Sequence, residues 1–268
     1  GAAGGEGQHV PAVAAGHTSS NEFGGGGVLT AMRFWHYSLA AMAMAGVAAQ
    51  AEDLDIEPVS MRMAPEESSS SLWISNVSQQ SVQMTARVFI WLQQGGDEVL
   101  LPTDDVVLSP PWVNILPGVQ QRVRVMRLNG AAQTLQERSY RIIVDAQNTQ
   151  PPQSATRYSL PLFLNMQGSA LVALQLCLSG EDAAHSWLRI HNAGQHHAKL
   201  VDLQYLPGVG AEAQVLMSEL AGYVLPGGYK RWQLDGSAAE FAAGQFTATV
   251  NGQVQSWPAV MCLDAPAP

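Results

Sequence analysis

The sequence is short of basic residues, and this shortage limits the partners it can have. It contains 13 Lys and Arg against 22 Asp and Glu, a formal net charge of −9. Removing the first 51 residues takes away one base and two acids and leaves 12 bases and 20 acids. Binding to nucleic acid relies on a basic surface that neutralises phosphates. The charge balance therefore argues against a nucleic-acid partner.

Motifs of catalysis and cofactor binding are also missing. There is no G-x-S-x-G nucleophile elbow and no C-x-x-C pair, and the glycine run at 24–27 does not match a phosphate loop. His191, His196 and His197 lie close in sequence, but no cysteine or acidic residue accompanies them at the spacing of a metal site. We interpret them as part of a solvated turn, and we predict no enzyme activity, no cofactor and no metal site.

The N-terminal region predicts export from the cytoplasm. Residues 1–31 are rich in glycine and show no periodic pattern, so we expect a spurious or disordered leader. Residues 32–51 have the pattern of a signal peptide, with Arg33 first, an apolar core at 38–47 and an A-x-A cleavage site at the end. That core is far shorter than the roughly 20 apolar residues needed to span a bilayer. We expect cleavage and no stable membrane insertion.

The sequence has two cysteines, Cys177 and Cys262. An exported chain enters an oxidising compartment, so a disulfide between them is the main expectation. It would close a long loop and stabilise the fold by roughly 4 kcal/mol in the chain-entropy model. Two buried free thiols are the alternative.

Nearly every remaining segment is typical of a β-strand, and none of a long amphipathic helix. At 82–92 all even positions are apolar, which predicts one buried face. Phe89 and Trp91 share the other face with Arg87, which suggests a contact surface in a cleft; cover by a loop or by a second domain is the alternative. Short strands with turn residues between them predict a sandwich or barrel. The length suits two domains, at 52–166 and 167–268.

The segment at 157–164 carries a row of large apolar side chains on one face of an extended strand. The row consists of Tyr158, Leu160, Leu162 and Leu164. Pro161 within the strand cannot donate a ladder hydrogen bond, which favours an edge position. A strand from another chain could pair there.

Taken in order, several segments resemble the periplasmic pilus-assembly chaperones of the chaperone–usher pathway. The resemblance is carried by the segments 71–76, 87–91, 110–111, 117–124, 137–141 and 158–163. Arg87-Val-Phe-Ile-Trp91 and Tyr158-Ser-Leu-Pro161 are most similar to the archaic branch, which serves pilins of the spore-coat-U type. The resemblance also implies a cis peptide bond before Pro110.

The resemblance implies an all-β protein of two immunoglobulin-like β-sandwich domains in a boomerang arrangement. Its implied role is that of a periplasmic chaperone that caps pilin subunits by donor-strand complementation and delivers them to an outer-membrane usher. Self-capping by weak homodimerisation is left open. The alternative function is a secreted β-sandwich that forms a structural or adhesive part of a pilus.

The resemblance also suggests residues for the binding site. Tyr158, Leu160, Leu162 and Leu164 would fill the groove of the subunit; the alternative is that these leucines fill this domain's own core. The lysine that anchors the subunit's C-terminal carboxylate in better-known members is replaced by Pro161. Candidate anchors are Arg87 first, then Arg157 and Arg62, because a buried carboxylate requires a cation. Glu137 matches an acidic residue of an interdomain charge network whose usual arginine is missing.

Overall fold

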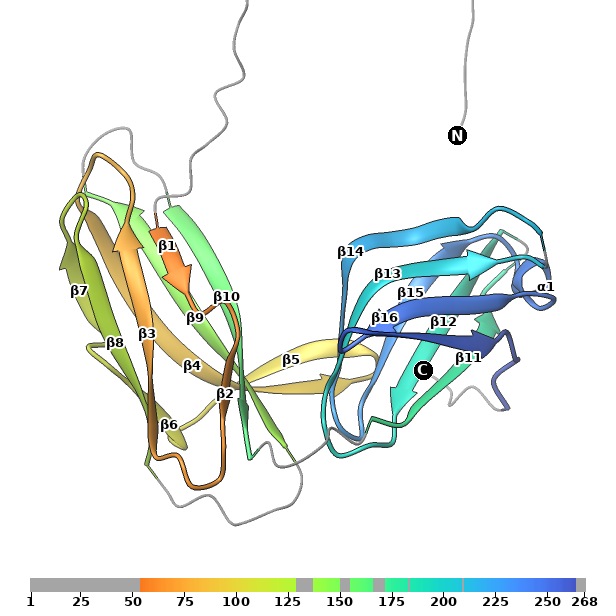
Figure 1. Cartoon of the computed structure of the whole chain (residues 1–268), viewed down its shortest axis with the longest axis horizontal. Coiled ribbons are helices and arrows are strands. Elements are labelled where there is room, and N and C mark those ends of the chain that lie inside the picture. Colours follow the sequence, from red (N-terminus) through yellow and green to blue (C-terminus); the bar gives the residue numbers. More distant parts are fainter. Residues whose placement is uncertain are drawn as a thin grey trace, which may run out of the picture. The chain divides into compact units, whose positions relative to one another are not determined.

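A computed structural model describes residues 54–128, 137–149, 155–165, 172–182, 184–208 and 210–263. The expected leader, the signal peptide and the expected domain boundary near 167 lie outside these residues. Within them most residues lie in strands, and there is one short helix, α1 (Ala238–Phe241) (Figure 1). The described part contains no helix that is long and apolar enough to cross a membrane. The all-β prediction is confirmed.

The first sandwich consists of two facing sheets (Figure 1). The four-stranded sheet has the order β1 (Leu54–Glu57), β3 (Ser69–Asn76), β8 (Gln120–Arg127) and β6 (Val106–Ser109). The six-stranded sheet has the order β2 (Met61–Met63), β10 (Ala155–Leu164), β9 (Arg138–Asn148), β4 (Val82–Gln94) and β5 (Asp97–Pro102), and β7 (Trp112–Ile115) also pairs with β4.

Pro58 explains how the N-terminal segment is shared between the two sheets. The peptide bonds before Pro58 and before Pro110 are both cis. β1 ends at Glu57 and pairs antiparallel with β3, whereas β2 starts at Met61 and pairs parallel with β10. Because proline removes a ladder hydrogen bond, the strand breaks at this position. The chain then crosses from one sheet to the other.

The core of the first sandwich lies between its two sheets. The even positions at the start of β4, namely Val82, Met84 and Ala86, are buried at 2% exposure or less. They pack with Leu72 and Ile74 of the facing sheet. Full burial of such side chains stabilises a fold by roughly 1.5–3 kcal/mol each. The alternation in the sequence predicted this face correctly.

The second sandwich has its own core and its own pair of sheets. One sheet has the order β11 (Leu174–Gly180), β12 (His185–Asn192) and β15 (Tyr229–Asp235). The other has the order β14 (Gln214–Val224), β13 (Ala198–Leu206), β16 (Gln245–Val250) and β17 (Gln253–Pro258). Asn251 and Gly252 join β16 to β17 with positive φ angles of 48° and 87°, as a tight hairpin requires.

A disulfide joins Cys177 on β11 to Cys262 near the C-terminus. Beside it, Leu178 and Met261 form a parallel β-bridge. The N–H of Leu178 donates a 2.8 Å hydrogen bond to the carbonyl of Val260. The disulfide therefore holds the last described residues against the edge of β11.

Candidate functional site

β10 has an open edge along the first part of its length. On one side β9 pairs with it from Ala155 to Leu164. On the other side β2 pairs with it only from Leu162 to Leu164. In the described part of the chain no strand pairs with the second side of residues 155–161. The edge position predicted from Pro161 is therefore found, and it ends where β2 begins.

The leucines of β10 face inward and are covered by the four-stranded sheet. Leu160, Leu162 and Leu164 are 5%, 0% and 0% exposed and belong to the core of the first sandwich. Tyr158 is half-buried against the same core, and its hydroxyl accepts a 3.1 Å hydrogen bond from the N–H of Leu54. In this structure the leucines thus fill their own domain, which is the alternative to the groove-filling role.

Arg87 and Arg157 both bind the same carboxylate, that of Asp145. The Arg87 Nη2 atom lies 2.7 Å from one carboxylate oxygen, and the Arg157 Nε atom lies 2.6 Å from the other. The hydrogen bond from Arg157 is the main cause that lowers the pKa of Asp145, and Arg87 adds to it. The same bond raises the pKa of Arg157. Neither arginine is an unpaired cation, which weakens both as carboxylate anchors.

The two predicted cleft aromatics have different surroundings. Phe89 is half-buried, with the Arg87 guanidinium 5.7 Å from its ring centroid. Trp91 is only 1% exposed, because it packs with Phe163, Tyr223 and Leu225 in a cluster contributed by both sandwiches. Its ring centroid lies 5.5 Å from that of Tyr223. Cover by the second domain is therefore the correct interpretation for Trp91.

Several hydrogen-bond donors gather around Tyr223. The Arg141 guanidinium lies 3.6 Å from the centroid of the Trp91 ring, and burial lowers the pKa of Arg141 although Glu98 opposes this. The indole N–H of Trp91 is buried without a hydrogen-bond partner in the described structure. Burial raises the pKa of Tyr223, and the positive charges of Arg141 and Arg62 oppose the rise. Trp91 and Tyr223 are thus part of a buried cluster, and Arg141 beside them is paired with Glu98 at 3.3 Å.

Arg62 is the remaining candidate among the three arginines predicted to anchor the carboxylate. It is exposed on β2 and stands opposite Phe163 in the parallel register of β2 and β10. Among the described residues it makes no salt bridge. The sequence placed Arg62 last among the anchor candidates and did not indicate Arg141. The contact of Arg141 with the Tyr223 ring joins residues far apart in the sequence, so no local pattern reveals it.

A buried carboxylate and two buried histidines connect the sandwiches beside this surface. The Nδ1 atom of His197 lies 2.9 Å and 2.8 Å from the two carboxylate oxygens of Glu137. The His197 ring stacks on Phe163 of β10 with centroids 3.5 Å apart. His196 Nδ1 lies 3.6 Å from the same carboxylate. Among the described residues no such group is arranged to hold a metal ion.

This cluster corrects the interpretation of the histidines. His196 and His197 are 3% and 2% exposed, so the prediction of a solvated turn is wrong for both. The reason is that Glu137 approaches from the first sandwich, and its own N–H donates to the carbonyl of Gln195. Glu137 of the first sandwich therefore pairs with His197 of the second. The resemblance had implied an arginine as the partner of this residue, and that arginine is missing from the sequence.

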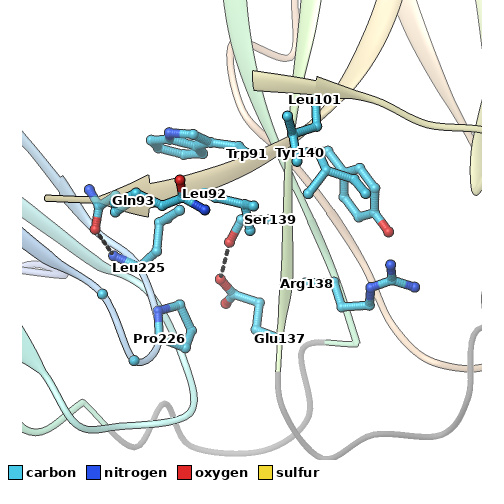
Figure 2. A pocket seen from close by; sticks show the side chains of 14 residues that line it. Trp91, Leu92, Gln93, Leu101, Glu137, Arg138, Ser139, Tyr140, Leu225 and Pro226 are labelled. Atoms are coloured by element: carbon cyan, nitrogen blue, oxygen red, sulfur yellow. Dashed lines mark hydrogen bonds between the residues drawn. The ribbon is translucent and has the colours of Figure 1, made fainter. Parts of the chain in front are cut away.

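A pocket of about 490 Å³ lies next to Trp91 and is drawn in Figure 2. Its apolar lining comes from Ile90, Leu92, Leu101 and Tyr140 of the first sandwich and from Leu225 and Pro226 of the second. The Gln93 side chain accepts a 2.9 Å hydrogen bond from the N–H of Leu225 and donates to the carbonyl of Tyr223 at 2.8 Å. Arg138 at its rim pairs with Asp105 at 2.6 Å. The pocket thus offers apolar surface and a paired cation, which does not suit a carboxylate.

Comparison with known proteins places these features in context. Residues 53–169 match the family model of the pili and flagellar-assembly chaperones, PapD N-terminal domain. No curated protein matches the chain. A chain from the CsuC–CsuE chaperone–tip adhesion subunit complex of archaic Csu pili of Acinetobacter baumannii superposes with a TM-score of 0.61 at 23% identity, covering 78% of this chain and 99% of that one.

Two further solved structures have a similar fold. The Escherichia coli chaperone DraB has a TM-score of 0.52 at 15% identity and covers 78% of this chain and 96% of its own. A chain from the Salmonella enterica SafA pilin–SafB chaperone complex has a TM-score of 0.51 at 13% identity, with 76% and 95% covered. At these identities the superpositions show a shared two-domain β-sandwich fold.

Proposed function

We propose that this chain, whose residues 53–169 match the family model of the pili and flagellar-assembly chaperones, holds pilin subunits by donor-strand complementation. It would do so in the periplasm after cleavage of the signal peptide, and it would pass each subunit to an outer-membrane usher. The observation that carries this proposal is the open edge of β10 at residues 155–161. A free edge offers unpaired N–H and C=O groups to an added strand.

The side chains that β10 would insert into the groove of a subunit lie N-terminal to its buried leucines. Side chains alternate along a strand, so Thr156 and Tyr158 continue the row of Leu160. Both are half-buried and lie on the open part of the edge. Leu162 and Leu164 then anchor the strand in its own core. We assign Thr156 and Tyr158 as the groove-facing residues.

Arg62 is the proposed anchor for the C-terminal carboxylate of the subunit. A carboxylate that enters a partly dry cleft needs a cation, because an unpaired buried charge costs several kcal/mol. Arg62 has no salt bridge in the described structure, whereas Arg87 and Arg157 already share Asp145.

Co-expression tests this function directly. The chain is produced in a bacterial periplasm together with the pilin encoded beside it, captured by an affinity tag and analysed by mass spectrometry. We expect a stable one-to-one complex that Thr156→Asp, Tyr158→Asp and Arg62→Gln each weaken. Arg124→Gln, at an exposed position of β8 in the other sheet, is the matched control. A folded chain that recovers no subunit would contradict the proposal.

A further inference from the structure

The outer face of the sheet β11-β12-β15 carries two arginines directly opposite each other. Arg189 on β12 and Arg231 on β15 are partners in the antiparallel register. Like charges that face each other across two strands destabilise a sheet. The pair therefore has a cost that the fold itself does not explain.

The placement is unusual because cations are scarce in this half of the chain. From residue 167 to the end there are four Lys and Arg and eight Asp and Glu. Two of these four cations, Arg189 and Arg231, stand side by side. If these arginines served only solubility, we would expect them far apart, because an acidic domain offers many carboxylates with which each could pair.

Each guanidinium lies over an aromatic ring of the same face. The Arg189 guanidinium carbon is 4.8 Å from the centroid of Tyr229, and that of Arg231 is 4.7 Å from the centroid of Trp187. Stacking on a ring holds a planar guanidinium flat and leaves its N–H groups available at the edge. This is the orientation in which arginine binds a carboxylate with two parallel hydrogen bonds.

Neither arginine is well neutralised. Arg189 makes no salt bridge in the described part of the chain, and its Nε atom is buried without a hydrogen-bond partner. Arg231 has one acidic neighbour, Asp97 at the tip of the β4–β5 hairpin, at 3.6 Å. The side chains of that pair are 42% and 75% exposed, so the interaction contributes little.

An apolar pocket adjoins the arginine face. It has a volume of about 470 Å³, and Arg189 and His191 line it together with Leu176, Val260 and Met261. Met261 is 52% exposed although it is held in place by the β-bridge to Leu178. Cationic and apolar surfaces thus meet at Arg189.

We propose that this face binds a short acidic peptide segment of a partner protein. Carboxylates of the segment would bind Arg189 and Arg231, and a neighbouring apolar side chain would enter the pocket beside Met261. Two stacked arginines beside an apolar pocket match carboxylates that alternate with apolar side chains, so a short acidic peptide is the ligand whose charge and shape complement this face. This site is separate from the open edge of β10.

The test observes the arginine side chains of the full chain by NMR, through their Nε–H resonances. The probe is the peptide acetyl-Glu-Leu-Glu-Leu-amide, and acetyl-Gln-Leu-Gln-Leu-amide is its neutral control. We expect saturable shifts of the Arg189 and Arg231 signals with the acidic peptide alone. Arg189→Gln and Arg231→Gln should each weaken binding about tenfold, the usual effect of losing a charge-assisted hydrogen bond, whereas Arg124→Gln should not change it.

Three further results decide the proposal. Asp97→Asn removes a weak acidic neighbour of Arg231, so binding should stay the same or tighten; weaker binding would count against Arg231 as a ligand. Inorganic phosphate that binds as tightly as the acidic peptide would reveal a general anion site and overturn the peptide assignment. If Arg189→Gln does not fold, Arg231→Gln at its exposed position carries the test, and unaltered binding by that folded variant refutes the proposal.

Discussion

Leu162 on β10 offers a sharp test of how the first domain uses this strand. The side chain is completely buried, and its register partners are Tyr140 on β9 and Met61 on β2. Shortening a buried leucine to alanine usually costs about 2–5 kcal/mol, because the cavity relaxes only in part. A domain with a stability of about 5–15 kcal/mol would keep its fold but lose much of its margin.

Urea unfolding followed by tryptophan fluorescence measures this loss. With a slope of about 1–3 kcal/mol per molar urea, a loss of about 2–5 kcal/mol in Leu162→Ala should lower the unfolding midpoint by roughly 0.7–5 M. Thr156→Asp should shift the midpoint far less and yet weaken capture of the pilin. If Leu162→Ala left the midpoint unchanged while removing capture, Leu162 would be a groove-filling residue and the reasoning from burial would be refuted.

Three further predictions concern other parts of the molecule. Replacing both Cys177 and Cys262 by serine should lower stability by roughly 4 kcal/mol, measured by thermal melting against the oxidised chain; an equal melting temperature would contradict this. Glu137→Ala removes the partner of His197, so it should cost about 3 kcal/mol, and an unaltered melting curve would show that the pair is not needed. The pKa of Asp145 is lowered in the folded state, so its contribution exists at neutral pH and disappears as the pH falls through the lowered pKa, below the ordinary aspartate range. Asp145→Asn should therefore lower stability at pH 7 by less than about 1 kcal/mol and leave it unchanged in strong acid, and the opposite trend would reverse the assignment.

Strand alternation predicted much of the fold because burial on one face leaves a direct record in the sequence. The apolar even positions predicted at 82–92 fall on β4, and Val82, Met84 and Ala86 at its start are buried. β14, at 214–224, was missed. Its pairing with β13 is interrupted by register shifts, and Glu219 and Gly222 have positive φ angles of 57° and 138°. Such bulges break the period of two on which the prediction depends.

The candidate site was less predictable, because alternation tells which side chains share a face and not what covers that face. The row from Tyr158 to Leu164 was recognised, but whether a subunit or the domain's own second sheet covers it depends on contacts distant in sequence. The same holds for Arg87, whose partner Asp145 lies 58 positions further along the chain. The membership of Glu137 and His197 in one buried cluster likewise follows only from the folded chain.

The short parallel strand β2 gives the open edge of β10 a fixed end. Because β2 occupies the second side of β10 from Leu162 onward, a strand added to β10 must stop at Pro161. The stretch from Ala155 to Pro161 then measures about 23 Å at roughly 3.3 Å per residue. β2 blocks the edge of β10 beyond Pro161. The position of β2, and not the sequence of an added strand, would therefore limit how far along β10 that strand can pair.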